Sequence, residues 1–380
     1  MRVVLIDDEY LPLLRLKDIL ENEIDNVEVV GVYQDSMQAY KQITSNPIDV
    51  LFMDIEMPGI NGLELAEKIQ EVAGDIEIVF VTGYSQYAIE AFELFAFDYI
   101  LKPIRVERLR KTIEQLSQRI SNKPIIKVKR DSENSIIQSF NQLKVQKGGT
   151  ESETLKWRTS KAQELFAYLL HHRGKTINRG ILVDLLWPSV DLENGMQQLY
   201  TTIYHIRRTL KQAGLDAVRI SSRNGGYTLE NSTIRIETEE WEEQLINLDK
   251  LSDQNSIEHE KVFYQYKGDY LGDYSYLWAE GEKERLKRLW INHGLGLIQF
   301  YRKKGDMQAA IKISMKIQQM YPEEEESYFE LMMVYASLKK VSAVEEQFQL
   351  LQTKLKDELN VLPSQRIIKW YQAWKVRHYN

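Results

Sequence analysis

The chain has 380 residues, a formal net charge of −7 and no cysteine. Its length predicts two or three domains, and the lack of cysteine excludes disulfides, thiolate metal sites and cysteine nucleophiles. The negative charge excludes a basic surface over the whole chain, so any nucleic-acid-binding surface must be local. No apolar run approaches the roughly 18 residues of a membrane helix, and no membrane partner is expected. The first residues lead directly into a strand without a signal peptide, which favours a cytoplasmic location.

Residues 1–120 alternate short apolar runs with amphipathic segments, which is typical of a parallel sheet covered by helices. Ligands of such open α/β sheets bind at the carboxyl ends of the strands, so polar side chains at those ends are candidates for a site. Four runs end in this way: Asp7 and Asp8 follow residues 3–6, Asp54 follows 50–53, Thr82 follows 78–81, and Lys102 follows 99–101.

Asp54 is the expected phosphoryl acceptor, because an aspartate can form a covalent acyl phosphate. The clustered carboxylates would repel an anionic phosphoryl group, and Mg²⁺ removes that conflict. We expect Asp8, Asp54 and a backbone carbonyl near Glu56 to bind the ion directly. Asp7 is expected to bind it through water.

Lys102 is the expected point charge for the phosphoryl oxygens, and the Thr82 hydroxyl is expected to hydrogen-bond the attached phosphate. Taken singly, each residue also suits a turn, a helix cap or a solvated surface. All four strand ends together favour the phosphoryl-acceptor interpretation.

Residues 4–9, 53–62, 80–84 and 97–103 closely resemble the motifs of the response-regulator receiver domain of two-component systems. The resemblance implies a flavodoxin-like, doubly wound α/β fold and phosphorylation of Asp54 by a sensor histidine kinase with Mg²⁺. It also implies that Tyr99 is a switch aromatic and that the Lys102–Pro103 peptide is cis. Phosphorylated receivers of this kind form homodimers, and residues 88–120 would supply the contacting faces.

A phosphatase of the haloacid-dehalogenase type is a rival interpretation, because it also uses an aspartate nucleophile with Mg²⁺. That class normally has a second aspartate two residues after the first, where this chain has Glu56. The acidic pair at the first strand and the Lys102–Pro103 pair favour the receiver.

Residues 121–135 are polar and of mixed charge, and we interpret them as a linker before a second domain at 136–232. This domain opens with strand-like segments at 136–145 and 155–157. Three helices follow, with caps expected at Ser160 and Asn178 and a third helix at about 194–213. A hairpin is predicted at 219–229, with Asn224-Gly225-Gly226 at its tip.

Three helices and a hairpin are the parts of a winged helix-turn-helix, whose third helix enters the major groove of DNA. Opposite its apolar stripe, that helix carries amides, hydroxyls and cations that suit base edges and phosphates. A structural domain with a solvated helix face is the alternative. The candidate DNA-binding residues are Gln198, Thr201, Tyr204, His205, Arg207, Arg208, Lys211, Arg219 and Arg223. Gln198, Thr201 and Arg208 are expected at base edges, and Arg207 and Lys211 at phosphates.

Residues 160–229 resemble the DNA-binding domain of OmpR-type regulators, in the variant found in SARP-type activators. The resemblance rests on residues 166–170, 181–188, 199–210 and 225–229. It implies binding to double-stranded promoter DNA.

Residues 237–380 read almost entirely as helix. Residues 234–238, 270–274 and 278–280 resemble the bacterial transcriptional activator domain of SARP-type proteins, and a faint repeat of tetratricopeptide period is present. Helical repeats of this type form protein-binding surfaces, and RNA polymerase is a candidate partner.

The combined interpretation is a multidomain response regulator in which phosphorylation of Asp54 controls DNA binding and transcription, without an enzyme activity of its own. A phosphorylation-regulated interaction scaffold that does not bind DNA is the remaining alternative.

Overall fold

The computed structural model describes residues 1–43, 47–60, 62–72, 76–83, 96–121, 135–148, 150–231 and 234–379. The predicted linker lies outside these ranges except at its two ends, and residues 88–95 of the predicted dimer segment also lie outside them. The chain divides into two compact units, Met1–Ser135 with Leu155–Ile234, and Ile136–Thr154 with Arg235–Asn380.

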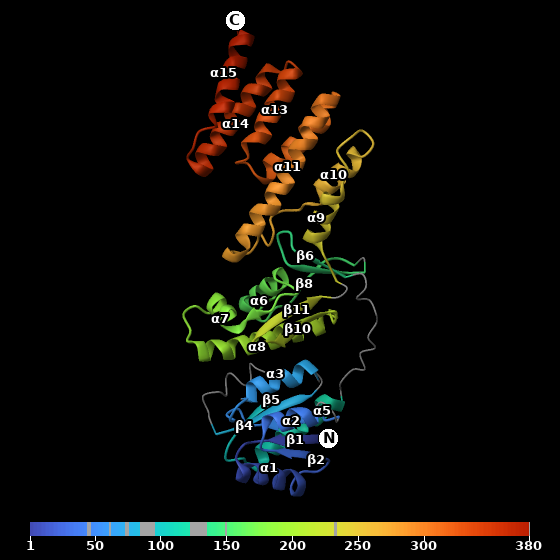
Figure 1. The fold of residues 1–380 in the computed structure, drawn as a ribbon, viewed down its shortest axis with the longest axis vertical. Coiled ribbons are helices and arrows are strands. Elements are labelled where there is room, and N and C mark those ends of the chain that lie inside the picture. Colours follow the sequence, from blue (N-terminus) through green and yellow to red (C-terminus); the bar gives the residue numbers. More distant parts are fainter. Residues whose placement is uncertain are drawn as a thin grey trace. The chain divides into compact units, whose positions relative to one another are not determined.

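A five-stranded parallel sheet of order β2-β1-β3-β4-β5 forms the centre of the first part (Figure 1). This is the strand order of flavodoxin-like folds and confirms the predicted doubly wound receiver. The strands are β1 Arg2–Ile6, β2 Glu28–Tyr33, β3 Val50–Met53, β4 Glu77–Thr82 and β5 Ala96–Leu101. The helices are α1 Tyr10–Asn22, α2 Ser36–Ile43, α3 Gly62–Val72 and α5 Val106–Ser121.

The receiver strands are continuous apolar runs because helices cover both faces of the sheet. All four residues of β3 are buried. Helix α1 buries Leu13, Leu16 and Leu20 at helical spacing against the sheet. The strands pair in parallel register, with Ile6 opposite Met53 and Met53 opposite Phe80. The residues that follow these strands therefore meet at one edge of the sheet.

The second part is the winged helix. It comprises α6 Ser160–His171, α7 Arg179–Leu186, α8 Leu192–Gln212, and the three-stranded sheet β10 Val218–Arg223, β11 Gly226–Asn231 and β9 Ile177–Asn178. Side-chain oxygens of Thr159, Asn178 and Asp191 cap the three helices. The first cap is therefore Thr159 rather than the expected Ser160. Asn224 and Gly225 both have positive φ, as the tight hairpin turn between β10 and β11 requires.

Residues 136–154 group with the C-terminal unit, which differs from the predicted domain at 136–232. Strands β6 Ser135–Gln138, β7 Lys144–Lys147 and β8 Glu153–Thr154 form a sheet with β12 Arg235–Ile236. The partner strand of β6 follows the winged helix in sequence, so no local pattern indicates the pairing. The winged helix is consequently an insertion between two segments of the C-terminal unit.

Helices form the rest of the C-terminal unit, as predicted (Figure 1). They are α9 Glu237–Asn247, α10 Ser256–Gln265, a short 3-10 turn Leu277–Ala279, α11 Glu280–Lys304, α12 Met307–Met320, α13 Glu325–Ser337, α14 Val341–Leu359 and α15 Gln365–Tyr379. Trp290 stacks on Phe263 and Tyr266 in the core, with ring centroids 4.8 and 4.9 Å apart.

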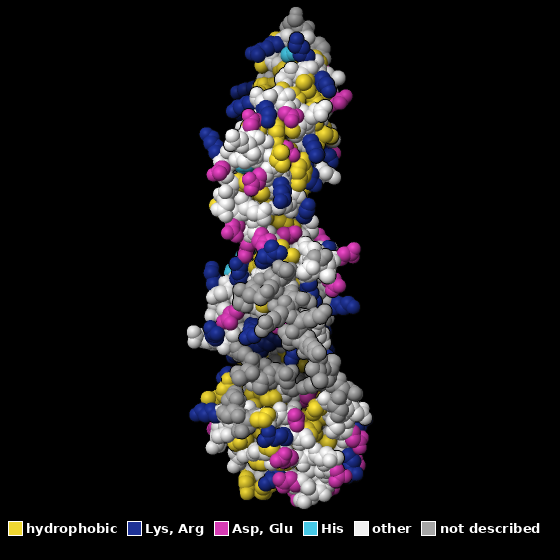
Figure 2. All heavy atoms as spheres, turned by 90° about the vertical axis from the view of Figure 1, so that its right-hand side faces the viewer, with side chains coloured by type: hydrophobic (Ala, Val, Ile, Leu, Met, Phe, Trp, Pro, Cys, Tyr) yellow, Lys and Arg dark blue, Asp and Glu magenta, His cyan; other side chains and the backbone are white. Residues whose placement is uncertain are grey.

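Both acidic and basic side chains are distributed over the visible face of the C-terminal helices (Figure 2). Ion pairs within the C-terminal unit join Arg285 to Glu242 and Lys287 to Glu323. Among the helices within the described ranges, none combines the length and the apolar character that crossing a membrane requires.

Candidate functional site

Three carboxylates meet at the carboxyl edge of the receiver sheet. Asp7 and Asp8 follow β1, Asp54 follows β3, and each offers an oxygen within 4.8 Å of the others. The Asp54 backbone N–H donates to the Ile6 carbonyl at 3.0 Å, which fixes this loop against β1. Asp7 and Asp54 are buried, and Asp8 is half-buried. The predicted acidic cluster is therefore assembled by the strand register.

The Lys102 ammonium lies between two of these carboxylates. Its Nζ is 2.7 Å from Asp7 Oδ2 and 2.7 Å from Asp54 Oδ2. The Lys102–Pro103 peptide is cis, as the receiver resemblance implied. Lys102 N–H donates to the Thr82 carbonyl at 2.8 Å, so the ends of β4 and β5 hold the lysine in place.

The electrostatics follow from two buried carboxylates sharing one ammonium. Burial raises the pKa of Asp7, although hydrogen bonds from Lys102 and the Glu9 backbone oppose it. Burial would lower the pKa of Lys102, but its hydrogen bonds to Asp54 and Asp7 raise it overall. The carboxylates of Asp7, Asp8 and Asp54 exceed the single Lys102 ammonium, and Glu9 lies 3.6 Å from that ammonium as well, so the surplus of negative charge suits a divalent cation. The residues present therefore fit Mg²⁺.

Thr82 and Tyr99 lie beside this cluster. Thr82 is fully buried, and within the described part of the chain its Oγ1 has no hydrogen-bond partner. A buried hydroxyl without a partner calls for an explanation, and an attached phosphate would provide that partner. The side chain of Tyr99, the expected switch aromatic, is buried in this conformation. Glu56 is exposed at the same loop.

Gly62 has a role that the motif alone did not explain. A Cβ at this position would lie 2.1 Å from the Asp54 carbonyl oxygen, so only glycine fits without movement. The Gly62 N–H donates to the Ile55 carbonyl at 2.7 Å. The first residue of α3 thus presses directly on the Asp54 loop.

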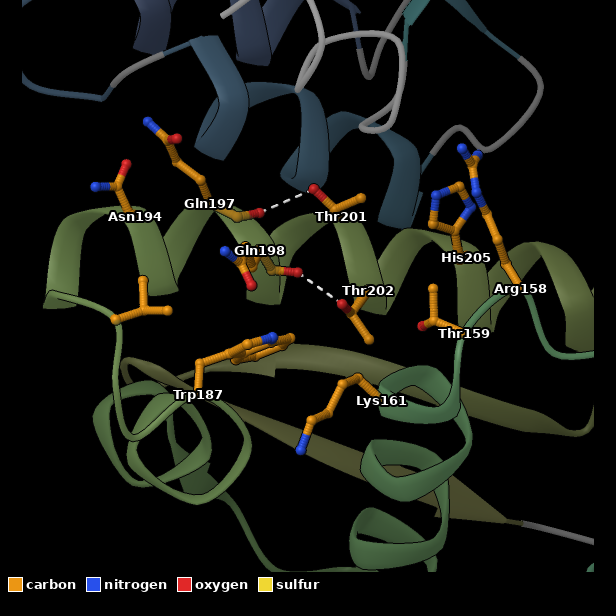
Figure 3. A pocket seen from close by; sticks show the side chains of 11 residues that line it. Arg158, Thr159, Lys161, Trp187, Asn194, Gln197, Gln198, Thr201, Thr202 and His205 are labelled. Atoms are coloured by element: carbon orange, nitrogen blue, oxygen red, sulfur yellow. Dashed lines mark hydrogen bonds between the residues drawn. The ribbon is translucent and has the colours of Figure 1, made fainter.

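The second candidate surface is one face of α8 (Figure 3). A pocket of about 600 Å³ lies between α8, the N-terminal end of α6 and the loop after α7. The predicted residues Gln198, Thr201 and His205 line it, together with Arg158, Thr159, Lys161, Trp187, Val190, Asn194, Gln197 and Thr202, which were not predicted. Basic residues around a helix N-terminus are a signal for anion binding that could have identified Arg158 and Lys161.

The structure separates the remaining candidates. Arg208 and Lys211 are exposed on α8, and Tyr204 is half-buried. Arg207 was expected at phosphates, but its Nε and Nη2 donate to the Ile220 carbonyl at 3.0 and 2.7 Å. This pairing ties α8 to β10.

On the wing, Arg219 and Arg223 are exposed. Arg223 Nη2 lies 3.0 Å from Glu230 Oε1, an exposed pair of the kind that contributes little to stability.

Three family descriptions match separate parts of the chain. They are the response regulator receiver domain over residues 3–114, the transcriptional regulatory protein C-terminal domain over 154–229, and the bacterial transcriptional activator domain over 258–374.

Each of the following relatives matches about a third of the chain. It is 35% identical over 138 residues to the transcriptional regulatory protein YpdB of Escherichia coli (strain K12), covering 35% of this chain and 56% of that protein. It is 39% identical over 125 residues to the transcriptional regulatory protein BtsR of Salmonella typhi, covering 33% and 52%. The chain thus spans about half the length of the curated relatives it matches.

Among solved structures, the response regulatory domain of protein MrkE from Klebsiella pneumoniae is 35% identical. The match covers 32% of this chain and 100% of the MrkE domain, with a TM-score of 0.31. The chain thus carries, in order, a response regulator receiver domain, a transcriptional regulatory protein C-terminal domain and a bacterial transcriptional activator domain.

Proposed function

We propose that Asp54 accepts a phosphoryl group from a sensor histidine kinase and that this modification controls transcription. The observation that carries the proposal is the cluster of Asp7, Asp8 and Asp54 with Lys102 Nζ 2.7 Å from the Asp54 carboxylate. In the transfer, an Asp54 oxygen forms the new bond to phosphorus while the bond from phosphorus to the donor breaks. The chain itself is a phospho-acceptor rather than an enzyme with its own substrate.

The surrounding side chains have distinct roles in this step. Asp8, Asp54 and the Glu56 carbonyl would hold Mg²⁺, with Asp7 acting through water, and the ion would neutralise charge on the phosphoryl group. Lys102 would move from the Asp54 carboxylate to a phosphoryl oxygen, because the acyl phosphate carries the negative charge outward. The Thr82 hydroxyl would donate to another phosphoryl oxygen.

Acetyl phosphate with Mg²⁺, followed by peptide mass spectrometry, tests the acceptor. We expect one phosphoryl group on the peptide containing Asp54, none in Asp54→Ala, and strongly reduced labelling in Asp8→Ala. Label that persists in Asp54→Ala would contradict the assignment. Sustained release of phosphate over many turnovers would instead favour the phosphatase interpretation.

We propose further that α8 reads promoter DNA. Exposed Gln198, Arg208 and Lys211 on this helix, and the pocket bordered by Arg158 and Lys161, support the proposal. Amide and guanidinium groups of this kind recognise base edges, and the cations around the α6 N-terminus suit backbone phosphates.

Gel-shift titration with genomic fragments tests DNA binding. Gln198→Ala, Thr201→Ala and Arg208→Ala should each weaken binding to the preferred fragment by on the order of 1–3 kcal/mol. Lys369→Ala, which removes an exposed charge from α15, serves as the control for a general loss of positive charge. Unchanged affinity in all three α8 variants would favour the scaffold interpretation.

The proposed partners follow from this function. We propose that the phosphorylated protein forms a homodimer, contacts RNA polymerase at promoters and acts in the cytoplasm. Sedimentation with and without beryllium fluoride, which mimics the phosphoryl group, tests the dimer. An unchanged mass across micromolar concentrations would contradict it.

A further inference from the structure

A second ion pair joins Asp98 of β5, the strand that ends one residue before Lys102, to Arg108 of α5. Asp98 of β5 is only 3% exposed. Its Oδ1 accepts from the Tyr99 N–H at 2.8 Å and from Arg108 Nη2 at 2.5 Å, and its Oδ2 accepts from Arg108 Nη1 at 2.6 Å and from the Thr112 hydroxyl. Four hydrogen bonds therefore fix this carboxylate.

Arg108 extends the same network to the backbone. Its Nη2 also donates to the Tyr99 carbonyl at 3.1 Å, and its Nη1 donates to the Thr112 hydroxyl at 2.9 Å. Arg108 and Thr112 lie one turn apart on α5. The helix thus grips both the Asp98 side chain and the main chain three residues before Lys102.

The position of this grip on β5 is significant. Side chains alternate along a strand, so Asp98 and Ile100 share one face of β5, and Lys102 follows directly after its last residue, Leu101. The pairing of β4 with β5 shifts register immediately before Asp98, where Ile78 lies opposite Ala96 and Val79 opposite Asp98. The pairing after this shift is regular from Asp98 to Leu101, and the hydrogen bonds from Arg108 add a side-chain connection to α5 over the same stretch.

We propose that Asp98 and Arg108 are positioning residues for Lys102. They connect β5 to α5 just after the register shift, and so they fix the position of the strand end from which Lys102 Nζ reaches the Asp54 carboxylate. The proposal rests on the proposed function of Asp54, since Lys102 matters there as the charge for the phosphoryl group.

The chemistry of the pair fits a positioning role better than a stabilising one. The Asp98 carboxylate is buried but the Arg108 side chain is 37% exposed, so water screens the guanidinium and the pair adds little net stability. Burial would raise the pKa of Asp98, but hydrogen bonds from Arg108 and Thr112 hold it below its ordinary value. Arg108 is thus the largest of the contacts that favour the charged form of this carboxylate.

Arg108→Met removes the grip while preserving most of the side-chain volume. Arg119→Met is the matched control, because Arg119 also ties α5 to the sheet through Glu77, at 3.0 Å, and lies over the Phe97 ring. Two quantities are measured on the full chain. One is the rate of Asp54 phosphorylation by acetyl phosphate with Mg²⁺, and the other is the acetylation rate of Lys102 by acetic anhydride, an amine-reactive reagent that releases acetate.

We expect Arg108→Met to slow phosphorylation at least about tenfold, since small displacements of a positioning group have effects of this order or larger. Acylation of the largely buried Lys102 should rise relative to surface lysines in the same digest. Arg119→Met should stay within about twofold of the wild type in both measurements. Arg108→Lys, which keeps the charge without the two-donor fork, should be intermediate and serves if the methionine variant does not fold.

A pH profile separates positioning from general loosening. In Arg108→Met the phosphorylation rate should recover as the pH is lowered, because protonation neutralises the uncompensated Asp98 carboxylate. The double variant Asp98→Asn/Arg108→Met should lack this recovery. Equal slowing in the Arg108 and Arg119 variants, or unchanged Lys102 acylation in Arg108→Met, would overturn the proposal. Failure to label Asp54 in the wild type would instead refute the proposed function, while the acylation measurement would still test the position of Lys102.

Discussion

At the scale of single residues, Gly62 shows how a backbone contact can determine a site. Because a Cβ there would collide with the Asp54 carbonyl, Gly62→Ala must displace either α3 or the Asp54 loop. We expect a loss of stability of about 1–3 kcal/mol and slower phosphorylation. Urea unfolding and acetyl phosphate labelling measure the two effects. Gly83→Ala is the control, since among the residues that the structure describes a Cβ at Gly83 meets nothing within 4 Å; equal effects in both variants would contradict the argument.

His293 is a second residue whose surroundings predict a measurable effect. It stacks on His259 with ring centroids 5.2 Å apart, and its Nε2 lies 3.0 Å from the His259 carbonyl. Burial, together with the neighbouring His259 ring, lowers the pKa of His293 below 6.5 in spite of that hydrogen bond.

Below pH 6.5 the unfolded chain therefore binds more protons at this position than the folded chain, so stability falls as the pH falls. Above pH 6.5 both states are neutral there and the effect vanishes. His293→Gln should flatten this acid-side decline in denaturant unfolding curves between that pH and the lowered pKa. The exposed His378→Gln is the control, and a decline of the same slope in both variants would count against the assignment.

At the scale of elements, the basic side chains of α8 differ in their surroundings: Arg207 is bonded to the neighbouring strand, whereas Lys211 is exposed. Arg207→Ala should destabilise the winged helix, because it removes two hydrogen bonds that connect α8 to the Ile220 carbonyl of β10. Lys211→Ala should leave stability unchanged and reduce the salt dependence of DNA binding by about one counterion unit. Thermal unfolding and gel shifts at several salt concentrations distinguish the two. A reduced salt dependence with intact stability in Arg207→Ala would restore the original expectation of a phosphate contact.

This contrast also marks the limit of prediction from helical spacing. Leu199, Ile203 and Ile206 recur every three to four residues along α8, and this spacing predicted the core face of the helix. All three side chains are buried, as expected. Spacing placed Arg207 on the flank, but it carried no information on a carbonyl of a strand that comes later in the chain. In the receiver, by contrast, the strand ends predicted the acidic cluster, since parallel register brings neighbouring ends together regardless of sequence distance.

At the scale of the whole chain, the C-terminal unit is completed by residues that precede the winged helix. Local patterns predicted strands at 136–145 but not their domain, because their partners lie about a hundred residues later. Glu237 Oε2 accepts from the Ser139 and Phe140 N–H groups at 3.1 and 3.2 Å. The Phe140 ring lies 5.8 Å from that of Trp241 and 4.8 Å from that of Tyr266.

Phe140→Ala should therefore destabilise the C-terminal unit and spare the winged helix. Removing a buried phenylalanine costs about 3–5 kcal/mol through lost burial and the cavity left behind. Hydrogen exchange resolved by peptide measures where the loss falls. We expect faster exchange in α9 and α10, because Phe140 packs against Trp241 of α9 and against Tyr266, which follows α10 directly. Exchange in α6 and α8 should be unchanged. Phe166→Ala, which truncates a buried phenylalanine of α6, should give the reverse pattern. Faster exchange in α6 and α8 after Phe140→Ala would show that residues 136–154 serve the winged helix, as the sequence had predicted.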